Sequence, residues 1–309
     1  MNFIDSTRKN LSDYITENGK TQSGVSKEMN VSDTTLSQFL SNIYPGDNEA
    51  VAQKAAQYLE LGAARKRMAK APPFCSAVEN TIKILTAVKM AHEGNDVLLM
   101  FGPSGCSKTT TLRGYAQQTN GAIYVEADAT TGSQRNILIS IMEALGKYPV
   151  RISTAQMMRD IISRLSGTNG LLIIDEAQHL NERAFDTLRA INDKAGIGIV
   201  FSGNRSILKR MFGRLELEYD QLYSRVGVFC ELKNKYALEE ISKMYKGICN
   251  DKQCLEYLHR TANQKGGLRR MVKHYKLAVN IADTLEQNLS VPILMEADKR
   301  ISVTGRNFT

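Results

Sequence analysis

The chain has 309 residues, of which 42% are hydrophobic, and a formal net charge of +8. This length and composition exclude a largely disordered chain and are typical of about two globular domains of about 150 residues each. The positive charge favours an acidic polymer as partner, and nucleic acid is the first candidate.

Cysteine spacing and hydropathy indicate the compartment. The five cysteines are scattered without C-x-x-C spacing, so they predict neither a zinc site nor a disulfide framework. The N-terminal stretch MNFIDSTRKNLSDYI lacks the apolar core of a signal peptide, and no later run approaches the roughly 18 apolar residues that span a bilayer. We therefore expect a cytoplasmic protein with no membrane partner.

Residues 21–42, TQSGVSKEMNVSDTTLSQFLSN, contain two short helical patterns. The first helix is predicted to end at Met29 and the second to begin near Ser32, because Asn30 between them tolerates a left-handed turn. The expected buried set is Val25, Met29, Val31, Leu36 and Phe39. With flanking helices at about 5–18 and 48–61, this pattern predicts a helix-turn-helix DNA-binding domain over residues 1–62. A small helical bundle that binds protein is the alternative.

The second of these helices carries outward polar side chains but no arginine that could contact guanine, so strong sequence specificity is not expected. Its candidate DNA-contacting residues are Thr34, Thr35, Ser37 and Gln38. Residues 63–73, AARKRMAKAPP, join a basic cluster to two prolines and predict an exposed basic linker. Its charges either keep the linker solvated or contact DNA phosphates.

Helical patterns alternate with short apolar runs over residues 74–227. The strand-like runs are DVLLMF, AIYVEAD, GLLIIDEA and GIGIVFSGN. This alternation predicts an α/β domain with a parallel sheet covered on both faces. After Gly227 the strand-like runs cease, and amphipathic patterns predict an all-helical C-terminal domain over residues 228–309.

Residues 97–116, VLLMFGPSGCSKTTTLRGYA, read as a strand, a glycine-rich turn and a helix. They match the phosphate loop G-x-x-x-x-G-K-[ST], except that Ser107 replaces the second glycine, which often has a positive φ. A serine in that conformation costs about 1 kcal/mol, which a multi-point phosphate site can absorb. The predicted nucleotide-binding residues are Gly102, Pro103, Ser104, Gly105, Cys106, Ser107, Lys108, Thr109 and Thr110.

In such a loop, backbone N–H groups and the N-terminus of the following helix bind phosphates. Lys108 is then expected to neutralise the β- and γ-phosphates of ATP, and the Thr109 hydroxyl to bind Mg²⁺. An accidental match is the alternative, and the strand before the loop and the helix after it argue against it.

Adjacent carboxylates end the apolar run LLIIDEAQHL, residues 171–180. Asp175 is predicted to hold Mg²⁺, and Glu176 to orient and deprotonate the attacking water. The alternative is an acidic pair that only starts a helix.

The order of these blocks resembles that of the AAA+ ATPases. The phosphate loop is followed by LLIIDE, a strand ending in Asn204, an arginine in LYSRVG, and GGLRR in the helical C-terminal region. With the N-terminal helices and the segment YPGDNE, the chain most resembles the family of the Mu bacteriophage transposition protein B, the target-DNA-capturing ATPases. The likeness runs over almost the whole chain in the same order.

The resemblance implies roles at matching positions. Asn204 would be the polar sensor that positions water against the γ-phosphate. Arg269 would be the sensor from the helical lid, with Arg270 as its rival. Arg225 would be the finger offered to a neighbouring subunit's nucleotide, and its rivals are Arg210 and Arg214.

The resemblance also implies an activity, the hydrolysis of ATP to ADP and phosphate. ATP-bound subunits would assemble as helical filaments on double-stranded DNA with little sequence preference. They would deliver this DNA to a transposase and stimulate that enzyme. Hydrolysis of ATP would then release the subunits from the DNA. Four lysines of the C-terminal region are candidates for contact with the DNA backbone, namely Lys233, Lys235, Lys273 and Lys276. The alternative is that they only keep a helical surface soluble. A replicative helicase loader of the AAA+ class and a nucleotide-switched transcriptional regulator are the alternatives.

Overall fold

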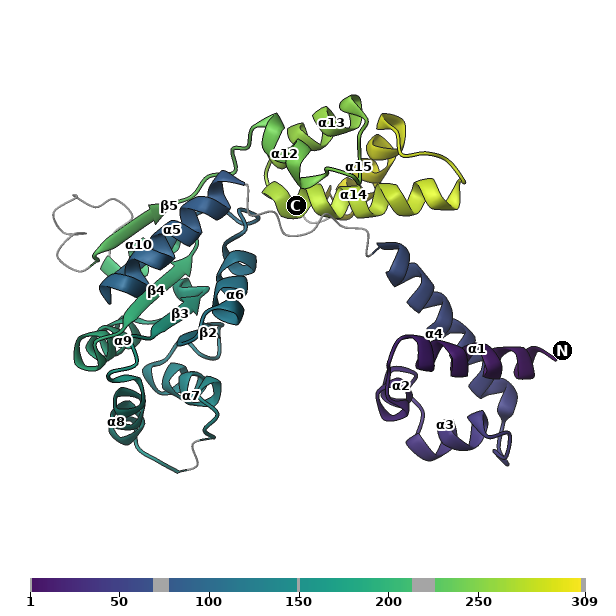
Figure 1. The fold of residues 1–309 in the computed structure, drawn as a ribbon, viewed down its shortest axis with the longest axis horizontal. Coiled ribbons are helices and arrows are strands. Elements are labelled where there is room, and N and C mark those ends of the chain that lie inside the picture. Colours follow the sequence, from purple (N-terminus) through teal and green to yellow (C-terminus); the bar gives the residue numbers. More distant parts are fainter. Residues whose placement is uncertain (1, 69–77, 149–150, 213–225, 307–309) are drawn as a thin grey trace. The chain divides into compact units, whose positions relative to one another are not determined.

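The computed structural model describes residues 2–68, 78–148, 151–212 and 226–306 (Figure 1). The chain divides into two compact units, which we treat separately. The first contains Met1–Ala71 and Val279–Gln287, and the second contains Pro72–Ala278 and Asn288–Thr309.

The N-terminal part of the first unit is helical, with α1 (Phe3–Glu17), α2 (Gln22–Glu28), α3 (Asp33–Leu40) and α4 (Asn48–Met68). The turn between α2 and α3 lies where the sequence predicts it. Asn30 has φ +53°, and the Ser32 hydroxyl accepts a 3.0 Å hydrogen bond from the Thr35 N–H at the start of α3. Buried apolar side chains from all four helices form the core of this part, among them Leu11, Val25, Met29, Leu36, Phe39 and Ala55.

Helix α4 is longer than the sequence analysis predicts. It continues to Met68, so the first residues of the expected linker are helical. The run AARKRM contains good helix formers, and the first helix-breaking proline comes only at Pro72. Residues 69–73 of the expected linker lie outside the described residues.

The second unit is built on a five-stranded parallel sheet in the order β2-β3-β4-β1-β5. The strands are β1 (Val97–Phe101), β2 (Ala122–Glu126), β3 (Leu171–Asp175), β4 (Gly198–Gly203) and β5 (Val228–Glu231). The residues of β1, β3 and β4 are all buried, as expected for continuous apolar runs covered on both faces. The predicted parallel sheet is thus confirmed.

Strand β5 corrects the prediction that strands cease after Gly227. It pairs with β1 in parallel, with Leu98 opposite Val228 and Phe101 opposite Glu231. The strand has four residues, and only Cys230 among them is buried. A run this short at a sheet edge gives almost no hydropathy signal, so its pairing with β1 determines its structure.

Helices cover both faces of this sheet (Figure 1). Leu98, Ile173 and Val200 pack with α5 (Glu79–Gly94) and α6 (Lys108–Gln118). Leu99, Leu172 and Phe201 belong to the cluster that includes α7 (Gln134–Ala144), α8 (Thr154–Leu165) and α9 (Glu182–Ala195). Strand alternation therefore divides the core into two layers. Helix α10 (Ser206–Phe212) follows β4.

After β5 the described elements are helices, namely α12 (Leu238–Met244), α13 (Lys252–Ala262), α14 (Gly267–Thr284) and α15 (Val291–Arg306). Tyr245 and Tyr275 pack edge to face with ring centroids 4.7 Å apart. Glu240 of α12 accepts a 2.6 Å hydrogen bond from the Glu79 N–H at the start of α5. The helices after β5 are therefore bonded to the α/β part within this unit.

Candidate nucleotide-binding site

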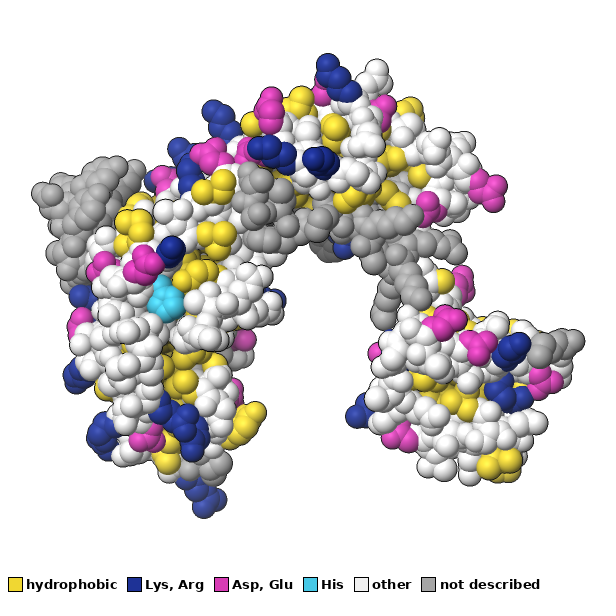
Figure 2. All heavy atoms as spheres, viewed as in Figure 1, with side chains coloured by type: hydrophobic (Ala, Val, Ile, Leu, Met, Phe, Trp, Pro, Cys, Tyr) yellow, Lys and Arg dark blue, Asp and Glu magenta, His cyan; other side chains and the backbone are white. Residues whose placement is uncertain are grey.

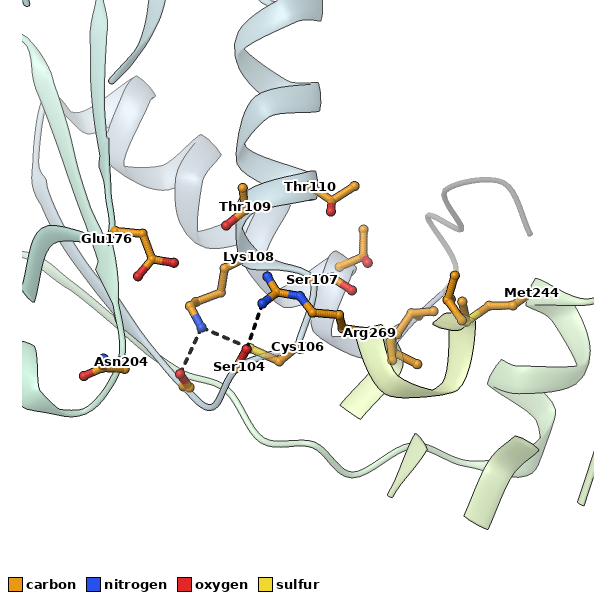
Figure 3. A pocket seen from close by; sticks show the side chains of 16 residues that line it. Ser104, Cys106, Ser107, Lys108, Thr109, Thr110, Glu176, Asn204, Met244 and Arg269 are labelled. Carbon is orange, nitrogen blue, oxygen red and sulfur yellow. Dashed lines mark hydrogen bonds between the residues drawn. The ribbon is translucent and has the colours of Figure 1, made fainter. Parts of the chain in front are cut away.

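A pocket opens where the carboxyl ends of β1, β3 and β4 meet, as expected in an open parallel sheet. In Figure 3, Glu176 and Asn204 lie on one side of the Lys108 ammonium and Arg269 lies on the other. The full lining is Val78, Thr81, Gly102, Ser104, Gly105, Cys106, Ser107, Lys108, Thr109, Thr110, Glu176, Asn204, Met244, Leu268, Arg269 and Val272.

The phosphate loop has the backbone that its sequence pattern predicts. Ser107 stands at the N-cap position of α6 with φ +71°, so this serine adopts the left-handed conformation usually taken by glycine. Helix α6 begins at Lys108, and the first N–H groups of a helix have no partner within the helix. The Lys108 side chain is buried, and its Nζ donates to the carbonyl oxygens of Gly102 (2.9 Å) and Pro103 (3.0 Å). The positive charge is thus held over the loop.

The two adjacent acids have different surroundings. Asp175 is fully buried, and its Oδ2 and Oδ1 accept hydrogen bonds of 3.0 Å from the Tyr124 hydroxyl and the Glu176 N–H. Burial and the Asp175 carboxylate raise the pKa of Tyr124 well above its usual range, so the phenol stays a donor. Glu176 has φ +54°, and its side chain lines the pocket. One acid is therefore enclosed, and its neighbour is accessible.

This environment fits a magnesium ion. Among the described residues, no lysine or arginine forms an ion pair with Asp175. A buried carboxylate is normally paired with a positive charge or bound to a metal, so a cation beside Asp175 would compensate its charge. Thr109 lines the pocket, whereas Asp175 does not. A carboxylate and a hydroxyl are the hard oxygen ligands that Mg²⁺ takes beside phosphate oxygens. The described residues contain no cluster of three or more His, Cys, Asp or Glu that could hold a metal.

A hydrogen-bonded chain that the sequence analysis missed joins the ends of β3 and β4. Gln178 donates from Nε2 to Glu176 Oε2, and its Oε1 accepts from the Asn204 N–H at 3.2 Å. The Asn204 Oδ1 in turn accepts from the Ser206 N–H (2.8 Å) at the start of α10. This leaves the Asn204 side-chain NH₂ as the donor for a ligand.

The helices after β5 complete the pocket. Arg269 of α14 donates to the Ser104 hydroxyl at 3.1 Å, and the Leu268 N–H donates to the Gly105 carbonyl at 3.0 Å. A Cβ at Gly105 would overlap the Gly266 carbonyl oxygen, so this close approach requires glycine.

The structure distinguishes the two sensor candidates, Arg269 and Arg270, by their contacts. Arg270 forms a 3.0 Å ion pair with Asp298 and does not line the pocket, so of the two rival sensors only Arg269 is placed at the site. Asn234, which the sequence analysis did not select, donates to the Ser104 carbonyl at 3.0 Å. The lining also includes four apolar residues, Val78, Met244, Leu268 and Val272.

The remaining predicted residues lie elsewhere. Arg225 and Arg214 are outside the described residues, and Arg210 is exposed on α10. Thr34 and Ser37 are exposed on α3, where Thr35 and Gln38 are half-buried. Lys233, Lys235 and Lys273 are exposed, and Lys276 is half-buried.

Comparison with known proteins identifies the family of the chain. Residues 91–211, which include the phosphate loop, Glu176 and Asn204, match the family described as AAA domain. The chain is 30% identical over 269 residues to the Mu-like prophage FluMu DNA transposition protein B of Haemophilus influenzae, covering 86% of this chain and 93% of that protein. The chain belongs to the family of transposition protein B.

Two further members of the transposition protein B family are similar over nearly the whole length. The ATP-dependent target DNA activators B of Escherichia phage Mu and Escherichia phage D108 are each 27% identical over 307 residues, which is 98% of this chain and 97% of each relative. The predicted family and its AAA fold are confirmed. Within the described ranges, the structure contains no helix that is both long and apolar enough to cross a membrane.

Proposed function

We propose that this chain is an ATPase that binds double-stranded DNA in its ATP-bound state, assembles on it, and delivers it to a DNA transposase that it stimulates. The observation that carries the proposal is the pocket in which the phosphate loop, Glu176, Asn204 and Arg269 come together. The names of the relatives, ATP-dependent target DNA activator B and DNA transposition protein B, support the part concerning DNA and transposition.

In this proposal the phosphate loop binds the triphosphate. The N–H groups at the start of α6 and the Lys108 ammonium contact the β- and γ-phosphates. The apolar side chains of the lining accept the base. Thr109 and Asp175 would hold Mg²⁺, which when bound offsets the negative charge of the phosphate oxygens.

Hydrolysis then requires a base on the open side of the γ-phosphate. Glu176 accepts the proton of the attacking water, the new bond forms between the water oxygen and the γ-phosphorus, and the bond to the bridging oxygen breaks to leave ADP. The Asn204 NH₂ orients the water or a γ-phosphate oxygen. Arg269, which reaches the loop at Ser104, stabilises the developing negative charge.

DNA contact is proposed for the polar residues of α3 (Thr34, Thr35, Ser37 and Gln38) and for Lys233, Lys235, Lys273 and Lys276. Figure 2 shows lysine and arginine side chains scattered among acidic ones on the visible face, without one large basic patch. Separate lysines that contact phosphates give affinity with little sequence preference. The lack of arginine on α3 supports the same expectation.

Assembly is the part of the proposal that involves more than one subunit. Arg225 is proposed to reach the nucleotide of a neighbouring subunit in a helical filament, and hydrolysis then releases subunits from DNA. The other candidates for this arginine finger are Arg210, which is exposed on α10, and Arg214.

Two variants test the proposal. Lys108→Ala removes the charge that faces the phosphates, so it should abolish nucleotide binding measured with a fluorescent ATP analogue, and DNA binding should lose its dependence on ATP. Glu176→Gln should bind ATP normally, hydrolyse it about 10²- to 10⁴-fold more slowly, and form longer-lived DNA complexes. Unchanged nucleotide affinity of Lys108→Ala or a parental rate of Glu176→Gln would refute these assignments.

Electron microscopy in negative stain tests assembly. With ATP and random-sequence duplex DNA, the parental protein should form filaments, and Lys108→Ala should not. A closed ring on a helicase would instead support a helicase loader.

A further inference from the structure

The side chain of Gln178 bridges two residues of the proposed hydrolysis site. It lies in a single turn of 3-10 helix (Ala177–His179) that follows Glu176. Its Nε2 donates to Glu176 Oε2, and its Oε1 accepts from the Asn204 N–H at 3.2 Å. Because a backbone N–H can only donate, this bond determines the amide orientation, with the NH₂ group toward the carboxylate.

Strand β4 leaves room for this side chain. A Cβ at Gly203, the last residue of β4, would overlap Gln178 Oε1, so any other residue there would displace the amide. Gly203 pairs with Phe101 of β1, directly before the phosphate loop, so its position is set by the sheet. The Gln178 amide is therefore seated on a rigid part of the fold.

We propose that Gln178 is the positioning residue for ATP hydrolysis, which holds the Glu176 carboxylate at a defined place relative to Asn204. This inference rests on the proposed function, in which Glu176 is the base. Both partners line the same pocket, on the same side of Lys108 in Figure 3. Gln178 itself does not line it, so its effect on hydrolysis acts through the Glu176 carboxylate that it holds.

The chemistry explains why such a residue is needed. A glutamate side chain has three rotatable bonds, and an unrestrained carboxylate at a pocket wall samples positions that do not face the attacking water. The hydrogen bond restrains one oxygen, Oε2, and so directs Oε1 for proton transfer. A misplacement of about 1 Å in an active site costs up to about 100-fold in rate.

The test compares Gln178→Ala and Gln178→Glu with the neighbouring variant His179→Ala in the full-length protein with DNA. Gln178→Glu keeps the shape but replaces the donor with an acceptor. We expect both Gln178 variants to bind a fluorescent ATP analogue within about threefold of the parental affinity and to lower kcat by about 10- to 100-fold. His179 is exposed, and its replacement should leave both values unchanged.

A double variant separates positioning from a general structural role. If Gln178 acts through Glu176, adding Gln178→Ala to Glu176→Gln should change kcat by less than about twofold, because the base is already absent. Gly203→Ala, which displaces the amide without altering Gln178, should lower kcat as Gln178→Ala does.

The outcomes distinguish this inference from the proposed function. A parental rate of Glu176→Gln would refute the base, and with it both proposals. A slow Glu176→Gln with a parental rate of both Gln178 variants would refute only the positioning role. Full additivity of the two effects on kcat in the double variant would also refute the positioning role. So would a Gln178→Ala protein whose nucleotide affinity and melting temperature fall together with kcat, if Gln178→Glu keeps the parental values.

Discussion

Replacing Ser107 with glycine should stabilise the protein. Ser107 has φ +71° and ψ 6°, and its side chain makes no capping hydrogen bond to α6, so little is lost when the side chain is removed. The left-handed conformation costs an L-residue about 1–2 kcal/mol, and glycine avoids this cost. Glycine also makes the unfolded chain more flexible, which lowers the free energy of unfolding by about 0.4–1 kcal/mol. The midpoints of these two ranges, about 1.5 and about 0.7 kcal/mol, predict a gain of about 0.8 kcal/mol in the free energy of unfolding.

For a unit of this size the gain corresponds to a rise of about 1–4 °C in melting temperature. Thermal unfolding followed by circular dichroism without nucleotide measures it, and the affinity for ATP should be retained or increased. Ser107→Ala is the matched control, because alanine keeps the Cβ in the left-handed conformation and should give no gain. If alanine stabilised as much as glycine, or if Ser107→Gly lowered the melting temperature, backbone strain at this position would not be the cause.

Two further pairs of variants test neighbouring contacts. Arg269→Ala should weaken ATP binding and hydrolysis, because the guanidinium reaches the phosphate loop. Arg270→Ala breaks a half-exposed ion pair with Asp298 and should lower only the melting temperature, by about a degree or two. Equal ATP affinity of the two variants would contradict this assignment. Tyr124→Phe removes a donor from buried Asp175 and should lower the free energy of unfolding in denaturant by about 1–3 kcal/mol. Tyr115→Phe, which leaves Asp175 unaffected, should have a smaller effect, and equal losses would show that the bond to Asp175 carries no special weight.

The features that the sequence predicts correctly are those with local causes. The turn at Asn30 and the start of α3 at Ser32 follow from backbone preferences and capping within a few residues. The conformation of Ser107 follows from its place between the strand and α6. Asp175 ends a buried strand and Glu176 follows it directly, so their presence at the carboxyl edge of the sheet follows from the parallel topology.

The errors occur where neighbouring elements decide the structure. Residues 228–231 form a strand only because β1 offers a free edge, and nothing in four residues predicts that partner. Similarly, the sequence contains both Arg269 and Arg270 without indicating which one faces the phosphate loop. The ion pair of Arg270 with Asp298, 28 residues later, decides between them.

Gln178 shows the same limit at the candidate site itself. It stands two residues after Glu176 in a segment that the sequence analysis selects, yet its residue type alone suggests only a polar surface position. Its role depends on the Asn204 N–H and on the space above Gly203, which belong to a strand more than 20 residues away and reach it only through the sheet register. A sequence pattern can identify the groups that react, because their chemistry restricts the residue type. The residues that orient those groups are restricted by geometry instead, and for Gln178 that geometry exists only once β3 and β4 are paired.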